Sequence, residues 1–263
     1  MQQQSSTTGI PQYSLGKILL VWAAAAAPMG ILGWVIGPAL GVGGSTAIGR
    51  LVGITIGLIW QFVLVLILLR GEGSTFRWAD LRERLWLLPP TNRSGRIDRR
   101  LWWWLIPLIL ISAVFAMMIA PVIQDAWTAL FPFFAEPESF SMNSFMASPE
   151  SRAALIGNWG LFFLFFVQMF FNTVIGEELL FRGILLPRMA GVFGKWDWVA
   201  NGILFGFYHW HQPWGMFTSA IDGTLLYALP SRLFKSAWFG IIVHSGQSVY
   251  FAFLLLGLVL GLA

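Results

Sequence analysis

Long apolar stretches recur along nearly the whole chain, and they constrain the fold more than any other feature. Stretches of about 20 apolar residues match the length that an α-helix needs to cross the hydrocarbon core of a bilayer. Charged residues make up only 11% of the 263 residues, whereas soluble domains carry about 25%. The apolar runs are continuous and do not alternate with period two, which excludes a transmembrane β-barrel. The sequence therefore predicts an all-α, polytopic transmembrane helical bundle.

The apolar windows predict about seven membrane segments. Residues 1–16 form a polar tail without the basic n-region of a cleaved signal peptide, so we expect the first apolar run to be a retained helix. The chain has no cysteine, which excludes disulfides, thiolate metal ligands and a cysteine nucleophile. The predicted segments cover residues 17–41, 50–70, 101–124, 155–187, 197–212, 214–230 and 237–262.

The charges of the links predict how the chain lies in the membrane. The link 71–100, together with Arg70, carries eight Arg against four acidic residues. The link 125–150 carries four acidic residues and no Lys or Arg. The positive-inside rule places the first link in the cytoplasm and the second outside, with the N-terminus cytoplasmic. We expect an integral, multi-pass protein of a bacterial inner membrane.

The stretch GEELLFRG, residues 176–183, places two carboxylates and a guanidinium in an apolar environment. Each such group costs about 2.5–3.5 kcal/mol on membrane-insertion scales. Glu178 and Arg182 are four residues apart and share a helix face, so we expect a structural ion pair. Glu177 is rotated by about 100° from Glu178 and needs a separate explanation.

Two of the three histidines fall at similar interior positions. His209 follows Phe205 by one turn, and His244 precedes Ser248 by one turn. At a rise of 1.5 Å per residue, Glu177, His209 and His244 lie about 15, 18 and 10 Å from the cytoplasmic ends of their helices. This common depth predicts a polar intramembrane cavity, and such a cluster of ionisable groups is a candidate functional site.

The remaining interior polar residues are interpreted as structural. His211 lies about 200° around the helix from His209, so we expect the two not to line the same cavity. Pro213 should end this helix near Gln212. His211 and Asp222 are interpreted as helix-end or loop polarity.

The chain resembles the CPBP family of intramembrane proteases, which includes CAAX prenyl endopeptidases and bacterial bacteriocin-processing or self-immunity (Abi-like) proteins. The family pattern places EExxxR, FxxxH and HxxxN or HxxxD on successive membrane helices. The resemblance covers roughly residues 155–262 and departs from the pattern at Ser248, where the family has Asn or Asp. The matching residues read Glu177-Glu178-x-x-x-Arg182, Phe205-x-x-x-His209 and His244-x-x-x-Ser248.

The resemblance implies an endopeptidase that cleaves membrane-associated substrates, including prenylated CAAX-type or bacteriocin-like ones. Glu177 would be the general base, with His209 positioning the water. His244 and Ser248 would form the oxyanion site, where a serine hydroxyl offers one donor against the two of an amide. The structural, non-catalytic residues would be Glu178, Arg182 and Phe205.

A metal-free mechanism is favoured over a zinc-dependent one. Glu177, His209 and His244 form a set of two histidines and one glutamate, which is a known catalytic zinc site. However, the chain has no HExxH motif, and a ligating Glu177 would not be free to act as a base. We therefore expect no cofactor, with zinc as the alternative.

The resemblance and the charge pattern together divide the chain into four parts. They are a polar cytoplasmic tail at 1–16, N-terminal transmembrane helices with a basic cytoplasmic loop at 17–124, an acidic external link at 125–154, and a CPBP-like catalytic core at 155–263.

Two alternatives to a protease come from other functional classes. A proton-coupled transporter would also carry buried Glu, His and Arg, but no inverted repeat is visible and the polar residues form one layer. A catalytically impaired scaffold of the same family is the second alternative, favoured by Ser248. The expected partners are the lipid bilayer and a membrane-associated peptide or protein substrate, with no nucleic acid.

Overall fold

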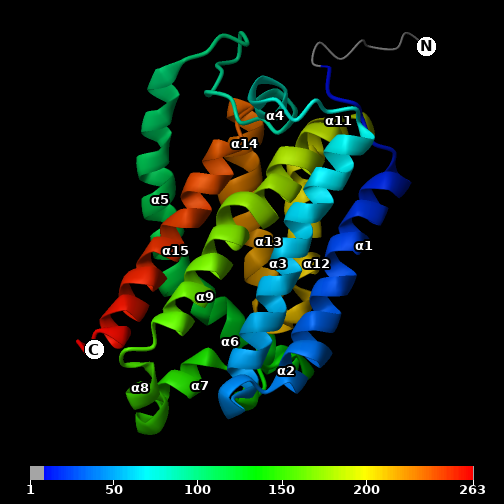
Figure 1. The fold of residues 1–263 in the computed structure, drawn as a ribbon. Helices are drawn as coiled ribbons and strands as arrows, with labels where there is room; N and C mark the ends of the chain where they lie inside the picture. The colour runs from blue at the N-terminus through cyan, green and yellow to red at the C-terminus, as the bar shows by residue number, and fades with distance from the viewer. Residues whose placement is uncertain (1–8, 263) are drawn as a thin grey trace.

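The computed structural model describes residues 9–262, and the described chain is an all-α bundle without a β-strand (Figure 1). Its α-helices are α1 Leu15–Ile31, α2 Gly37–Leu40, α3 Thr46–Gly71, α4 Trp78–Arg84, α5 Leu105–Val114, α6 Ala120–Leu130, α7 Met142–Ala147, α8 Pro149–Leu155, α9 Trp159–Phe170, α10 Leu186–Arg188, α11 Ala190–Phe193, α12 Asp197–Tyr208, α13 Met216–Asp222, α14 Leu229–Phe234 and α15 Trp238–Val259.

Several neighbouring helices are continuous, because π-helical or 3₁₀ turns join them into longer rods. Within residues 9–262, five of these rods are long and apolar enough to cross a membrane, which confirms the polytopic helical bundle. The five rods are Leu15–Leu40, Thr46–Gly71, Arg99–Leu130, Trp159–Arg188 and Trp238–Val259.

Two of the seven expected segments are helical but are not among these five rods. The segments expected at 197–212 and 214–230 correspond to α12 and to α13 with α14. They form a helical hairpin: a Cβ built at Gly206 would lie 2.8 Å from the Cα of Ala220. The apolar side chains of this hairpin face both ways: Phe205 and Leu226 are buried, whereas Phe207 and Leu225 are 55% and 49% exposed.

Two expected boundaries of the spanning segments also move, and part of the tail is packed. The third segment continues past residue 124 to Leu130. The fourth begins at Trp159, because α8 is a separate short helix before it. In the tail, residues 1–8 lie outside the described part, while Ile10 and Tyr13 are each only 3% exposed, so this end of the tail packs against the bundle.

The two ends of the bundle carry different elements (Figure 1). The short helices α4 and α11 and the end of α14 lie at one end, where the described chain begins. The other end carries α2, α7, α8 and the C-terminus. Between them, α3 packs against α1 and against the π-helical turn Phe171–Gly176, so the first and last parts of the chain share one apolar core.

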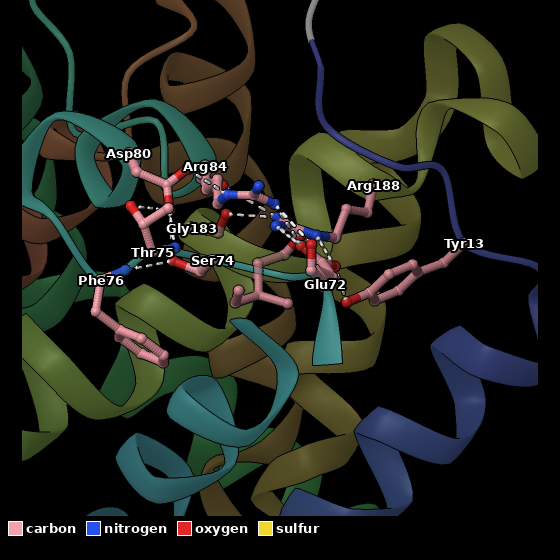
Figure 2. A network of polar contacts seen from close by, with 10 residues as sticks. Tyr13, Glu72, Ser74, Thr75, Phe76, Asp80, Arg84, Gly183 and Arg188 are labelled. Carbon is pink, nitrogen blue, oxygen red and sulfur yellow. Dashed lines mark hydrogen bonds and ion pairs between the residues drawn. The ribbon is translucent and has the colours of Figure 1, made fainter. Parts of the chain in front are cut away.

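Ion pairs and a hydrogen bond join four chain segments at the α4 end (Figure 2). Arg188 donates from Nε and Nη2 to the two carboxylate oxygens of Glu72, at 2.7 and 2.6 Å. Tyr13 donates its hydroxyl to the same carboxylate at 2.5 Å. Arg84 lies 3.8 Å from Glu72 and 2.6 Å from Asp80. We call these five residues the Glu72 network.

The Glu72 carboxylate is held in its charged form. Its side chain is only 4% exposed, and burial by itself would raise its pKa. The hydrogen bonds from Arg188 and Tyr13 outweigh burial and keep the pKa of Glu72 below its ordinary value. Arg188 ends the rod that begins at Trp159, so the network fixes one end of that rod.

Candidate active site

Glu177 lies between two π-helical turns, Phe171–Gly176 and Leu179–Leu185. Such turns are rare and are frequent at functional sites, because they widen the helix and redirect side chains. Gly176 permits the first turn, since a Cβ there would lie 2.3 Å from the carbonyl oxygen of Phe171. The side chain that follows is turned into the bundle, and Glu177 is only 2% exposed.

Two polar side chains lie beside the Glu177 carboxylate. The Asn172 amide, with its nitrogen turned toward the carboxylate, donates to the two oxygens at 2.9 and 3.0 Å. The Tyr208 hydroxyl, which accepts a hydrogen bond from the amide of Gln61, is a second polar group beside the carboxylate. Sequence reasoning did not identify Asn172, because the π-helical turn between it and Glu177 breaks the 3.6-residue periodicity.

The predicted ion pair of Glu178 and Arg182 is present and completely buried. Arg182 Nη1 lies 3.1 Å from Glu178 Oε1, and both side chains are 0% exposed. Arg182 also donates to the carbonyl oxygen of Gly223 at 3.0 Å and lies 4.2 Å from the ring centre of Phe205. Glu178 additionally accepts from His244 Nδ1 at 3.0 Å, so one carboxylate holds both the arginine and a histidine.

Each candidate histidine is fixed through its Nδ1 atom. His209 Nδ1 lies 2.8 Å from the carbonyl oxygen of Phe205. Because a carbonyl only accepts, Nδ1 carries a proton, and neutral His209 keeps its lone pair on Nε2. The ring of His244 stacks on Tyr227 with 4.7 Å between centroids and 15° between planes. Nε2 of each histidine is therefore the nitrogen free for chemistry.

Glu177, His209 and His244 line one cavity of about 280 Å³. The three side chains that were expected to lie at a similar depth in the membrane thus share one cavity. Sequence reasoning did not assign the other polar side chains of this wall to the site. They are Gln168, Asn172, His211, Gln212, Ser219, Asp222, Tyr227 and Gln247.

The expectation that His209 and His211 cannot share a cavity is wrong. Both line it, and their ring centroids lie 5.5 Å apart with planes inclined by 26°. The α-helix ends at Tyr208, four residues before the end near Gln212 that Pro213 led us to expect, and residues 209–211 form a 3₁₀ turn. The α-helical rotation of 100° per residue therefore does not apply between the two histidines.

Asp222 also belongs to the cavity wall, and its interpretation as helix-end or loop polarity is wrong, because the π-helical turn Gly223–Ala228 continues α13 directly into α14. Its Oδ2 lies 3.4 Å from the hydroxyl of Tyr227, and its buried Oδ1 has no hydrogen-bond partner among residues 9–262. Nothing in the sequence around Asp222 distinguishes this position from an ordinary helix end.

Ser248 lines a neighbouring apolar groove and is not among the residues of the polar cavity. Gln247 lines both spaces. Its amide nitrogen lies 3.1 Å from the Tyr227 hydroxyl and 3.3 Å from Ser112 Oγ. Residues three and four positions after His244 share its helix face, so the spacing alone did not separate Gln247 from Ser248.

A shared metal ion is not indicated by the described side chains. In residues 9–262, no group of three or more His, Asp or Glu is placed to hold one. The metal-free expectation remains a prediction.

The cavity combines a buried carboxylate, two imidazoles and several amides. A carboxylate beside an imidazole lone pair can hold and deprotonate a water molecule, and imidazole and amide N–H groups can stabilise an oxyanion. A general base and hydrogen-bond donors of this kind are the groups that hydrolysis of a carbonyl compound by an activated water molecule requires.

Comparison with known proteins agrees with the motif resemblance. Residues 158–250 match the family model described as type II CAAX prenyl endopeptidase Rce1-like. The match includes every residue of the EExxxR, FxxxH and HxxxS motifs. No curated protein and no solved structure gives a significant match. Residues 158–250 are therefore similar to the Rce1-like type II CAAX prenyl endopeptidases, which is consistent with a protease of the CPBP family.

Proposed function

We propose that this protein is an intramembrane endopeptidase that hydrolyses membrane-associated peptides by activating water at Glu177. The observation that carries the proposal is the cavity that Glu177, His209 and His244 line together. The amide of Asn172 donates to both oxygens of this carboxylate and so holds it in a fixed orientation in the cavity.

In the first step, the water lies between Glu177 and Nε2 of His209. Glu177 accepts a proton from the water while the oxygen attacks the scissile carbonyl carbon. The tetrahedral intermediate then collapses, the C–N bond breaks, and the protonated Glu177 gives its proton to the leaving amine. The oxygen of the water thus ends in the new carboxyl group, and the proton that Glu177 took from it ends on the new amine. Glu177 returns to its unprotonated form.

His244 stabilises the oxyanion in this proposal. The Glu178 carboxylate on Nδ1 favours the imidazolium form, in which Nε2 also carries a hydrogen to donate. Arg182 forms an ion pair with Glu178 and keeps this carboxylate in place beside His244. Gln247 supplies the second donor expected of Ser248, because its amide lines the polar cavity and can exchange its 3.3 Å contact with Ser112 for the substrate.

The proposal is tested with purified protein in liposomes and a quenched fluorescent membrane peptide. Glu177→Gln keeps the shape of the side chain but removes the base, and we expect a loss of about 10²–10⁴-fold in rate. Glu138→Gln, in the link before α7, is the matched control and should keep full activity. Unchanged cleavage by Glu177→Gln would refute the role of Glu177.

The same assay tests metal dependence. We expect full activity after exhaustive chelation, since Glu177 would act as a base and not as a ligand. Loss of activity that zinc restores would instead support a zinc site at Glu177, His209 and His244.

One observation favours an impaired scaffold as the second candidate. Ser248 replaces the family's Asn or Asp and is not among the residues of the polar cavity. A scaffold would bind its partner equally well with or without the Glu177 carboxylate.

A further inference from the structure

A second, larger space adjoins the polar cavity. It is a groove of about 630 Å³ between α9 and α15, closed at one end by α7 and α8. Most of its lining is apolar, from side chains that include Met146, Phe165, Met169, Phe251, Leu254 and Leu258. Methionine side chains adapt to differently shaped apolar ligands.

The groove opens to the outside of the bundle. Phe251 and Leu254 line it and are 57% and 47% exposed. Both belong to α15, one of the rods long enough to span a membrane, so the opening faces lipid. The groove is lined in part by α7 and α8, and these helices lie at the end of the bundle away from α4 (Figure 1).

The groove and the polar cavity share part of their walls. Gln168, Asn172, His244 and Gln247 line both spaces. A ligand in the groove therefore contacts the amide side chains of Gln168, Asn172 and Gln247, which also line the cavity that contains Glu177. Amides donate and accept hydrogen bonds, which a lipid tail cannot use.

We propose that this groove binds an unwound apolar peptide segment, which enters sideways from the lipid between α9 and α15 near α7 and α8. The proposal rests on the proposed peptidase function and names the substrate class. A peptide backbone withdrawn from its own helix must find other hydrogen bonds in a low-dielectric environment, and the amides of Gln168, Asn172 and Gln247 supply them. The apolar walls then select apolar side chains next to the scissile bond.

Photo-crosslinking tests occupancy of the groove without relying on cleavage. A benzoylphenylalanine replaces Phe251 or, as the matched control, Phe253, in Glu177→Gln protein. Both positions are phenylalanines of α15 that are more than half exposed, but only Phe251 lines the groove. The probe is a biotinylated Leu/Ala/Gly peptide of bilayer-spanning length in liposomes. We expect several-fold more peptide crosslinking at position 251, removed by excess unlabelled peptide. Equal crosslinking at both positions, or phospholipid adducts alone at 251, would overturn the proposal.

A variant whose side chain fills the groove tests whether peptide binding in the groove is needed for cleavage. Met146→Trp should abolish binding of the peptide and slow cleavage of membrane-embedded substrate, whereas Phe253→Trp should change neither. If Met146→Trp cleaves normally while Glu177→Gln does not, the groove assignment fails and the peptidase function stands. If position 251 crosslinks the peptide but Glu177→Gln cleaves normally, the groove holds and the catalytic assignment fails.

Discussion

At the level of single residues, hydrogen bonds decide which atom of each side chain is free for chemistry. The Phe205 carbonyl and the Glu178 carboxylate each engage the Nδ1 atom of one histidine. The FxxxH spacing therefore has a local cause, because Phe205 and His209 are one turn apart and the bond joins residue i to residue i+4. The ring of Phe205 also stacks on the guanidinium of Arg182. Phe205 therefore contacts both the Glu178–Arg182 ion pair and His209, which would position the water.

A substitution pair on α15 tests which side chain stabilises the oxyanion. Gln247→Leu removes the amide that lines the polar cavity, and we expect kcat to fall by about 10²–10³-fold. Ser248→Ala removes a hydroxyl that lines only the apolar groove, so it should have a small effect. The measurement is steady-state cleavage by both variants. A larger loss of kcat in Ser248→Ala than in Gln247→Leu would show that Ser248, and not Gln247, stabilises the oxyanion.

At the level of elements, one close approach between α15 and the Glu177 rod holds the site together. A Cβ built at Gly240 would lie 2.4 Å from Glu178 Oε2. This contact lets α15 come near enough for His244 to reach Glu178. A side chain at this position would push α15 outward.

Gly240→Ala should therefore lower both thermal stability and activity. We expect a loss of about 1–3 kcal/mol in stability, as for other overpacked sites. Gly246→Ala is the control in the same helix, since its Cβ would meet nothing closer than Ile109 at 3.8 Å. Thermal unfolding of the two variants in detergent checks this prediction. Equal behaviour of both would show that the packing against Glu178 relaxes easily.

The Glu72 network should make the end of the same rod sensitive to acid. The pKa of Glu72 lies below its ordinary value in the folded protein, so unfolding raises it and takes up a proton at low pH. The stabilisation is complete above the ordinary pKa of 4.5 and is lost as the pH falls through the folded value. Thermal unfolding between pH 7 and pH 3 should show a smaller pH dependence in Glu72→Gln than in the wild type. An identical pH dependence would show that Glu72 does not carry it.

At the level of the whole molecule, the helical bundle predicted from the sequence is confirmed, whereas the number of its membrane spans remains a prediction. Long apolar windows located all five spanning rods. The hairpin of α12 to α14 is helical but is not among these rods, so the two spans expected there remain a prediction. The motifs located Glu177, His209 and His244, whereas Asn172 and His211 depend on a π-helical turn and a 3₁₀ turn that regular periodicity does not foresee.

The orientation of the bundle remains a prediction that the missing cysteines make easy to test. Single cysteines can be placed in the links 71–100 and 125–150 of a chain that has none. We expect a membrane-impermeant maleimide to label intact bacterial cells only at 125–150, because the basic link should be cytoplasmic. Labelling at 71–100 alone would reverse the orientation, and would place the mouth of the apolar groove in the cytoplasmic half of the bilayer.

The most direct test of the central claim is mass spectrometry of newly formed peptide termini in membranes. Cells expressing the wild type are compared with cells expressing Glu177→Ala at matched levels of inserted protein. The account predicts a set of termini present only with the wild type, next to apolar residues in membrane-associated proteins. The same set of termini in both membranes would contradict water activation by Glu177 and leave the chain as a scaffold.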